Sequence, residues 1–465
     1  RRNEPDALRL VEEGLFYKNK REKIDGKYVR LLYERARKSA ETDGKTASHA
    51  EVFKEMPDEL SFHRRDGGGE RESDIYISPS GLERYGRCPF SHFVFYGLSP
   101  KEKRIVEIGG RERGDLFHRL LMNFSKALTK SGVEITAQRS PWMELTREES
   151  DALVTSLLDD LLENPETAAI FRRGRAEEYR AARILELAKE AAWAVAEQVK
   201  AGAIREMYFE ERFGADRRFP AIAENLKGGG RVLIEGQIDR IDILRGGRAK
   251  ILDYKSGNEK FNVDEARNGW RLQLMLYMRA VAGPVLADAE GMERNADADE
   301  RDERERLKPA GVFYFIIGEP QLNCVDWSDA PGAERREKIA REIRKSFKLD
   351  GIAVDDQDAL KSIAGTDYGG KHYEKGHSDI ISVRAKADKE TGEIVLAGNT
   401  ALSRKIMAAA EFAGLQRDVE EKLSEFCSSL ANGVIYVDPK RTKLMTACKF
   451  CDYRGICCYD IQFAE

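Results

Sequence analysis

Apolar positions first follow a helical spacing and then, from about residue 206, change to the spacing of strands. Apolar residues three and four apart indicate amphipathic helices, which are predicted at about 114–128, 146–162, 175–200, 264–282 and 400–432. Short apolar runs indicate strands, which are predicted at 207–209, 231–244, 249–255 and 312–317. This order predicts an α/β fold in which a small mixed sheet packs against helices.

A further helix is expected to begin at the sequence Ser78-Pro79-Ser80. Either serine can cap its first turn, because a serine hydroxyl accepts hydrogen bonds from the free backbone N–H groups there. Glu83 lies three residues after Ser80, which is the spacing of a capping box. The sequence therefore predicts a helix start that leads towards Cys88-Pro89.

Two regions depart from this pattern. Residues 1–73 contain short helical stripes followed by the glycine-rich run Arg64–Gly69, so they are interpreted as the helical tail of a preceding region and a linker. Residues 286–308 are rich in Asp, Glu and Arg and contain few apolar side chains, which predicts a solvated insertion. One domain is therefore expected over residues 74–465, with the acidic insertion inside it.

Composition excludes some classes of protein. Hydrophobic residues make up 41% of the 465 positions, and no apolar run of about 18 residues exists, so no membrane span is expected. The net charge of −4 argues against a basic coat but leaves room for a local DNA channel. The motif G-x4-G-K-S/T is absent, so no ATP is expected to bind this chain. The chain starts at Arg1, without a start methionine or signal peptide, and is expected to be a piece of a longer protein.

Two strands joined by the turn at 245–248 carry the most informative charges. Asp253 and Lys255 are two apart on the second strand, so both side chains project from one face. A centred turn places Asp239 of the first strand opposite Tyr254, and its carboxylate near that of Asp253. Two carboxylates suit Mg²⁺ or Mn²⁺, and a lysine beside them can stabilise charge on a phosphate or hold the attacking water.

Each element of this site also has a simpler interpretation. An aspartate and a lysine on a hairpin can form an ordinary surface pair. Gln273 and Tyr277, four apart on one helical face, can form a helix edge. His118 lies at the margin of an apolar helical stripe and can be structural rather than a metal ligand.

Cysteines near the end of the chain predict a second metal site. Cys448, Cys451 and Cys457 form C-x2-C-x5-C, and Cys88 is the candidate for a distant fourth ligand. Zinc and an iron–sulfur cluster both accept four thiolates, but zinc ribbons use two local pairs, so the lone distant ligand favours a cluster. Cys458 can replace Cys457, and a metal-free group of thiols is the remaining alternative.

Together and in this order, these motifs resemble the nuclease domains of the AddB family, the B subunits of bacterial AddAB helicase–nucleases. The likeness covers about residues 74–461. The matching segments, in chain order, are Ser78–Phe90, Gly114–His118, Gly236–Asp242, Leu252–Lys255, Gln273 with Tyr277, and Cys448–Cys457.

The resemblance implies a PD-(D/E)XK restriction-endonuclease-like core with a C-terminal iron–sulfur clasp. It implies that Mg²⁺ or Mn²⁺ is bound at His118, Asp239, Asp253 and Tyr254. It assigns Lys255 a catalytic role, with Asp239, Asp253, Gln273 and Tyr277 completing the catalytic group. A 4Fe–4S cluster is expected at Cys88, Cys448, Cys451 and Cys457.

The function implied by the resemblance is that of a metal-dependent DNA exonuclease domain in double-strand break processing and recombinational repair. It would act in the bacterial cytoplasm on an unwound single strand, the 5′-terminated one, beside an AddA-like helicase–nuclease subunit. Trp270 and Arg271 are candidates for the DNA groove, and Trp270 can equally be a core residue. The alternatives are a free-standing iron–sulfur exonuclease and a non-catalytic, cluster-stapled DNA-binding scaffold.

Overall fold

The computed structural model describes most of the chain from residue 74 onwards. The described residues are 17–18, 22–23, 74–100, 109–171, 174–227, 230–257, 259–283, 307–318, 332–365, 372–398, 405–441, 446–449, 451–457 and 459. The predicted helical stripes and the linker within 1–73 lie outside them, as do nearly all of the predicted acidic insertion at 286–308 and Cys458. Within 1–73 the described part is the pair β1 (Tyr17–Lys18) and β2 (Glu22–Lys23).

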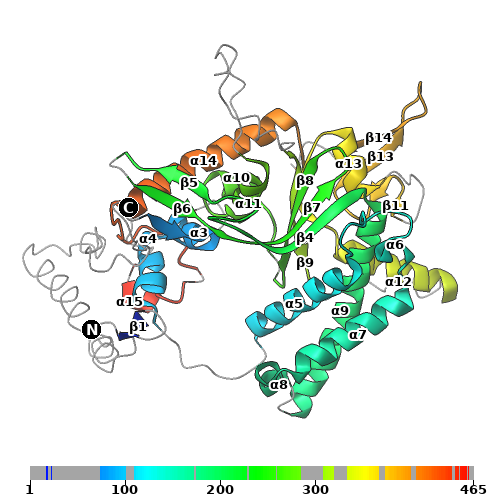
Figure 1. Cartoon of the computed structure of the whole chain (residues 1–465), viewed down its shortest axis with the longest axis horizontal. Helices are drawn as coiled ribbons and strands as arrows, with labels where there is room; N and C mark the ends of the chain where they lie inside the picture. Colours follow the sequence, from blue (N-terminus) through cyan, green and yellow to red (C-terminus); the bar gives the residue numbers. More distant parts are fainter. Residues whose placement is uncertain are drawn as a thin grey trace, which may run out of the picture.

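A mixed sheet of six strands forms the centre of the described part (Figure 1). Its order is β15 (Ile406–Met407), β10 (Asp350–Val354), β9 (Lys308–Ile316), β8 (Arg248–Lys255), β7 (Gly236–Leu244) and β4 (Ile204–Phe213). The β8–β9 and β10–β15 pairs are parallel, and the other neighbours are antiparallel. The predicted small mixed sheet is thus confirmed.

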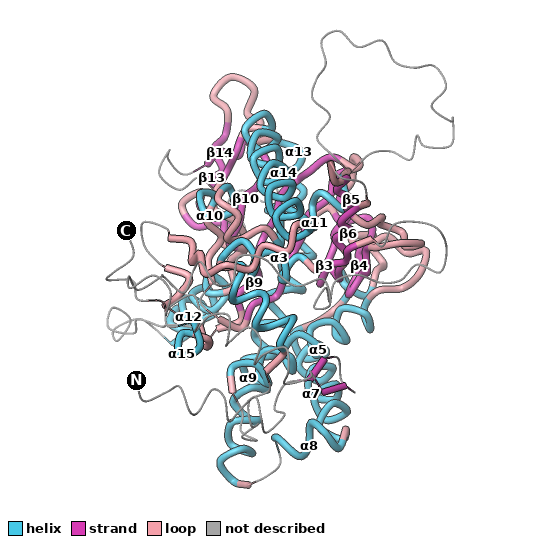
Figure 2. The backbone as a smooth tube through the Cα atoms, turned by 90° about the vertical axis from the view of Figure 1, so that its left-hand side faces the viewer, coloured by secondary structure: helices cyan, strands magenta, loops and turns pink. Residues whose placement is uncertain are grey.

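Alternation along the strands builds an apolar cluster on each face of this sheet. Leu252 and Phe313 pack with α5 (Gly110–Leu128), α7 (Arg147–Glu163) and α9 (Arg175–Ala201). Ile251 and Val312, one residue earlier on the same strands, pack with α11 (Gln273–Ala282) and α14 (Ala409–Ala431). Figure 2 shows α5, α7, α8 (Pro165–Phe171) and α9 gathered at one end of the molecule. Helices thus cover both faces, as expected for a mixed sheet in an α/β domain.

The predicted single strand at 231–244 is wrong, because the chain changes sheets at Glu235. Residues before it form β6 (Arg231–Ile234), which lies between β3 (Ile75–Ile77) and β5 (Ile222–Asn225) in a three-stranded sheet. Gly236 then starts β7, and a Cβ there would lie 2.9 Å from the ring of Phe213. The close approach of that ring explains why glycine stands at the junction.

The predicted helix at 264–282 is also wrong, since it is two helices, α10 (Val263–Arg267) and α11. Gly269 has a φ of +82°, in the left-handed region that ends helices. The ring of Phe426 lies where a Cβ of Gly269 would be, at 2.6 Å. The break places Trp270 and Arg271 in a short connection at the start of α11. The helix predicted at 400–432 likewise begins later, at Ala409.

Helix α3 (Pro79–Arg87) begins where it was predicted, with Ser78 as its N-cap. The Ser78 hydroxyl accepts a hydrogen bond from the N–H of Gly81 at 3.1 Å. The capping box predicted between Ser80 and Glu83 is therefore wrong. Glu83 instead accepts a hydrogen bond from the N–H of Gln273, 190 residues later in the chain.

The remaining elements surround this core. They are α4 (Pro89–His92), the π-helix η4 (Phe93–Leu98), α6 (Pro141–Glu144), α12 (Gly332–Ser346), α13 (Gln357–Ala364), α15 (Arg454–Cys457), and the antiparallel strands β11 (Tyr373–Glu374), β12 (His377–Ser378), β13 (Val383–Ala387) and β14 (Ile394–Gly398). Helices α4 and α15 lie side by side in Figure 1, although the sequence separates them widely. In the part of the chain that the structure describes, no helix combines the length and apolarity that a membrane span requires.

Candidate active site

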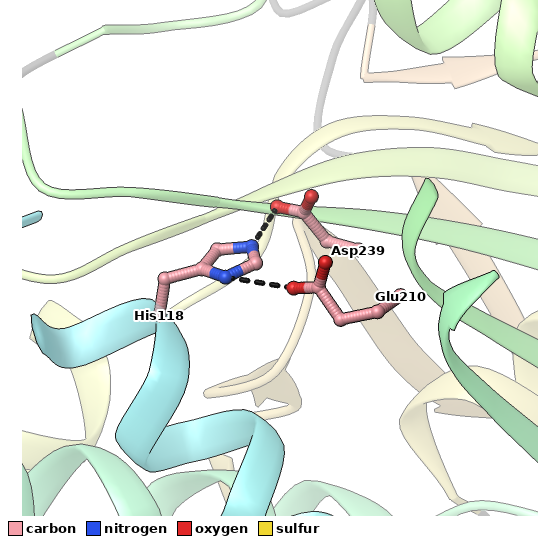
Figure 3. A group of neighbouring side chains, drawn as sticks. All are labelled: His118, Glu210 and Asp239. Carbon is pink, nitrogen blue, oxygen red and sulfur yellow. Dashed lines mark ion pairs between the residues drawn. The ribbon is translucent and has the colours of Figure 1, made fainter. Parts of the chain in front are cut away.

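His118 lies at the exposed margin of α5, where the apolar stripe of that helix meets the central sheet. Phe117 and Leu121 beside it are buried and hold the helix against the sheet. The imidazole lies between two carboxylates, with Nδ1 2.8 Å from Glu210 Oε1 and Nε2 2.9 Å from Asp239 Oδ2 (Figure 3). One ligand atom from each of the three residues lies within 4.8 Å of the others.

Glu210 is the member of this group that sequence reasoning missed. It lies in β4, in register with Asp239 of β7, because Phe209 pairs with Arg240 and Glu211 with Ile238. Its φ of +53° is rare for a residue with a side chain and marks a local irregularity in the strand. A glutamate in a strand beside the aspartate strand was the available signal, but its unusual backbone angle was not predictable.

The charges in this group favour a cation. Burial lowers the pKa of His118, but hydrogen bonds with Asp239 and Glu210 and their negative charges outweigh burial and raise the pKa to about 10. An imidazole nitrogen and two carboxylate oxygens also form a donor set that suits Mn²⁺ or Mg²⁺. The residues therefore fit the divalent metal expected from the sequence.

The hairpin of β7 and β8 brings the second carboxylate to the same place. Arg240 pairs with Leu252, so continuing this register places Asp239 opposite Asp253. The predicted pairing with Tyr254 is wrong by one residue. Leu244 pairs with Arg248, so the turn has three residues instead of an even number, and its two glycines have positive φ. Opposed residues point to one face of a sheet, and Asp239 Oδ2 also accepts a hydrogen bond from the N–H of Tyr254 at 2.9 Å.

Asp253 is buried beneath this site and pairs with Lys255. The lysine Nζ lies 2.7 Å from Asp253 Oδ2. Burial and the negative charge of Asp239 raise the pKa of Asp253 to about 7, against the opposing charges of Lys255 and His118. The positive charge of Lys255 and His118 is thus too small to keep both carboxylates fully ionised. A bound divalent cation would stabilise the ionised form of both.

Lys255 is held by a chain of polar side chains. Its Nζ donates to Gln273 Oε1 at 3.1 Å, and Gln273 Nε2 donates to the hydroxyl of Tyr277 at 2.7 Å. The ring of Tyr314 lies 5.4 Å from the same Nζ, within the range of a cation–π contact. The structure therefore brings Lys255, Gln273 and Tyr277 together beside Asp253.

Tyr254, predicted as a metal ligand, turns its side chain to the other face of the sheet. Its ring packs edge-on against His118, with ring centroids 5.8 Å apart, and against Phe315. On the same face, buried Asp242 accepts hydrogen bonds from Arg240 at 2.6 and 2.9 Å, and its Oδ2 lies 2.7 Å from Lys250 Nζ. The metal role of Tyr254 stays a prediction, whereas its backbone N–H has a defined part in orienting Asp239.

The four cysteines predicted as cluster ligands gather at one corner of the molecule, here called the cysteine corner. Cys88 lies between α3 and α4, and it shares a small apolar cluster with Cys457. Cys451 Sγ lies 4.0 Å from the hydroxyl of Ser91, across 360 residues of sequence. Burial raises the pKa of Cys448, and the nearby Cys457 and Cys451 raise it further. Four cysteines from both ends of the described region therefore lie near one another in this corner.

The two candidate groove residues, Trp270 and Arg271, are both largely enclosed by the protein. Trp270 is 6% exposed and lines a hollow of about 730 Å³ with Lys440 and Arg441. Arg271 forms ion pairs with Glu259 and Glu265, so its charge is already balanced within the protein.

Comparison with known proteins agrees with this geometry. Residues 76–458 match the family model of the PD-(D/E)XK nuclease superfamily. The chain is similar to the B subunit of the ATP-dependent helicase/deoxyribonuclease from Alkaliphilus oremlandii, at 29% identity over 397 residues, 85% of this chain and 31% of that protein. The corresponding protein of Thermoanaerobacter sp. (strain X514) is 29% identical over 400 residues, 84% of this chain and 30% of that protein. That of Clostridium botulinum (strain Loch Maree) is 29% identical over 392 residues, 83% of this chain and 30% of that protein. The chain thus spans about a third of the length of these relatives, and the resemblance to the AddB family is confirmed.

Proposed function

Since the chain belongs to the PD-(D/E)XK nuclease superfamily, we propose that it is a divalent-metal-dependent deoxyribonuclease domain. The observation that carries the proposal is the convergence of His118, Glu210 and Asp239 within 4.8 Å. The ion pair of Asp253 and Lys255 lies next to this group. A purely structural ion pair would not need three further ligand residues, one from each of α5, β4 and β7.

Four side chains would hold the Mg²⁺ or Mn²⁺, namely those of His118, Glu210, Asp239 and Asp253. When bound, such an ion polarises a phosphodiester and lowers the pKa of a water molecule. Lys255 has a separate task, because Asp253 and Gln273 keep its ammonium group beside the site. There it stabilises negative charge that develops on the phosphate oxygens.

An iron–sulfur cluster is the second cofactor of the proposal. Cys88, Cys448, Cys451 and Cys457 supply four soft thiolate ligands, a donor set that suits zinc or iron. Zinc ribbons use two local pairs of ligands, whereas here three local cysteines are joined by Cys88, 360 residues before Cys448. This arrangement of ligands supports a 4Fe–4S cluster.

The proposed substrate is one unwound DNA strand, the 5′-terminated one, in double-strand break repair in the bacterial cytoplasm. The relatives are named as subunits of an ATP-dependent helicase/deoxyribonuclease, and this sequence lacks a P-loop of its own. A motor subunit of AddA type would therefore feed the strand to this site. The accessible ligand group at the sheet margin suits a flexible single strand.

The metal-site assignment is tested on the full chain with end-labelled single-stranded DNA and Mg²⁺ or Mn²⁺. Asp239→Asn keeps the size of the side chain and removes a ligand charge, and it is expected to abolish cleavage. Asp418→Asn, at an exposed ion pair with Arg267, is the matched control and keeps activity. Equal activity in both variants would refute the assignment.

The strand assignment needs the assembled complex with a helicase subunit and an end-labelled duplex. Asp253→Ala in this chain is expected to stop cutting of the 5′-terminated strand while the other strand is still cut. Unchanged cutting of both strands would contradict the proposal.

A further inference from the structure

Helix α3 connects the cysteine corner with the catalytic lysine. Cys88 directly follows the helix and caps its C-terminus, with its backbone N–H bonded to the carbonyl of Arg84 at 3.0 Å. Tyr85 on the buried face donates to the carbonyl of Val434 at 2.9 Å. One end of α3 is therefore fixed to the segment that leads to the C-terminal cysteines.

Two charged residues of α3, one turn apart, hold the connection between α10 and α11. Glu83 Oε1 accepts a hydrogen bond from the backbone N–H of Gln273 at 2.8 Å. Arg87 donates from Nε and Nη2 to the carbonyl of Trp270 at 3.3 and 3.1 Å. The two side chains also pair with each other at 3.4 Å. Glu83 and Arg87 thus hold the two ends of the connection, the N–H of Gln273 and the carbonyl of Trp270.

The bond from Gln273 to Glu83 replaces a local helix cap. Leu272 is the N-cap residue of α11, and its apolar side chain offers no hydrogen bond to the first turn. Free N–H groups at a helix start favour a carboxylate. The side chain of Glu83 is only 13% exposed, so this carboxylate is enclosed by the groups that it serves.

The same residue, Gln273, holds the lysine of the proposed active site. Its backbone faces Glu83, while its side-chain oxygen accepts the hydrogen bond from Lys255 and its amide group donates to Tyr277. A shift of the first turn of α11 would therefore move the acceptor away from the lysine. Displacements of about 1 Å in an active site are enough to slow catalysis by up to about 100-fold.

We propose that Glu83 and Arg87 are positioning residues, which set the place of Lys255 through Gln273 and tie it to the helix that ends at Cys88. The inference rests on the proposed nuclease function, because it assigns Lys255 its catalytic task. It adds that the two residues act on Lys255 without touching it. Their effect is transmitted by the backbone of 270–273.

Steady-state kinetics with the full chain and single-stranded DNA separate positioning from general stability. Glu83→Ala is expected to lower kcat by about 10- to 100-fold with little change in KM, and Glu83→Gln, which keeps the acceptor oxygen, recovers most of it. The control is Glu149→Ala, which removes the capping-box partner of Thr146 at the start of the distant helix α7. The control is expected to lose stability similarly and keep its kcat.

A double-mutant cycle tests the route through Gln273. In a Gln273→Ala background, Glu83→Ala is expected to lower kcat by less than about twofold more, because the link to Lys255 is already broken. Full additivity of the two losses would overturn the route. Equal kcat values for Glu83→Ala and Glu149→Ala at equal stability would overturn the positioning role itself.

A readout independent of cleavage keeps the two proposals distinguishable. The rate at which an amine-reactive reagent acylates Lys255, followed by mass spectrometry, is expected to rise severalfold in Glu83→Ala and to stay constant in Glu149→Ala. A wild-type chain that cuts no DNA would refute the proposed function, and the acylation rates would still decide the positioning of Lys255. An unchanged acylation rate of Lys255 in Glu83→Ala would overturn the positioning role of Glu83.

Discussion

Two regions of the molecule, joined by α3, gather side chains that bind metals well. In the active site, His118 lies between Glu210 and Asp239, and Lys255 pairs with Asp253, so each carboxylate has a cationic neighbour. In the cysteine corner, burial raises the pKa of Cys88 to about 11, which keeps its thiol protonated at neutral pH. The first region thus has counter-charges of its own, whereas in the second the proposed metal cluster would supply the positive charge that favours thiolates.

The two regions also differ in how much apolar core surrounds them. The active-site strands lie between the two large apolar clusters of the central sheet. The cysteine corner has a small separate cluster, built from 88–98 and from residues after Gly433. Backbone bonds from Phe90 to Tyr436 and from Lys440 to Arg87 join these segments. The active site is therefore enclosed by the main core, whereas a small cluster and a few backbone bonds hold the corner, where the proposed metal cluster would join the two segments further.

The largest expected effect is the loss of the proposed cluster in Cys88→Ala. Structural metal sites contribute on the order of 10 kcal/mol of binding free energy to folding. The variant should lose its iron, about four atoms per chain for a 4Fe–4S cluster, and hydrogen exchange should accelerate in 88–98 and 435–441. The β7–β8 hairpin should keep its protection.

Cys427→Ala is the matched control, because Cys427 is fully buried in α14, outside the cysteine corner. It should keep the iron content of the wild type. Iron retained by Cys88→Ala, or stoichiometric zinc in the wild type, would contradict the cluster.

The next effect is catalytic. Asp253→Ala is expected to reduce cleavage by more than about 10³-fold, as the loss of a strong transition-state contact does. Its unfolding free energy should fall less than that of Asp242→Asn below, since burial makes the Asp253 carboxylate costly to ionise and Lys255 keeps its bond to Gln273. Thermal unfolding and cleavage assays on one preparation measure both. Cleavage at the wild-type rate in this variant would show that Asp253 is not part of the active site.

The buried ion pairs under the hairpin give a test of stability alone. Asp242 is fully buried between Arg240 and Lys250, and Asp242→Asn leaves two cations without their partner charge. A loss of about 3–5 kcal/mol in unfolding free energy is expected. Adding Lys250→Met should recover part of it, because only one cation then remains. Denaturant unfolding measures both variants, and a loss below about 1 kcal/mol would contradict the expectation.

The sequence was most informative where function depends on local spacing. Asp253 and Lys255, two apart on a strand, and Gln273 and Tyr277, four apart on a helix, do meet in the structure. Spacing of this kind follows from the geometry of a single element. The placement of His118 beside Asp239 required the order of motifs as well, because the two lie on different elements.

Features that depend on contacts between distant segments were not predictable. The left-handed backbone of Glu210 has no local cause in its sequence. The break between α10 and α11 depends on Gly269 meeting the ring of Phe426. The register at Asp239 depends on a turn with an odd number of residues between Leu244 and Arg248. In each case a partner far away in the sequence, or one unusual backbone angle, decides the outcome.

The smallest expected effect concerns the proton on His118 in the absence of divalent metal. The pKa of His118 is raised to about 10 because its bonds to Asp239 and Glu210 outweigh burial. A raised folded-state pKa gives stability that is fully present below the unfolded value of about 6.5 and is lost as pH rises towards 10. In a chelator, wild type should therefore exceed His118→Gln in unfolding free energy by on the order of 1–2 kcal/mol at pH 6, after allowance for solvent screening. The difference should shrink to near zero at pH 10.

Saturating Mn²⁺ should flatten the pH dependence of the wild type, because the ion takes over the charge of the proton. A difference that is constant from pH 6 to 10 would show that the imidazole does not serve as the counter-charge of the two carboxylates.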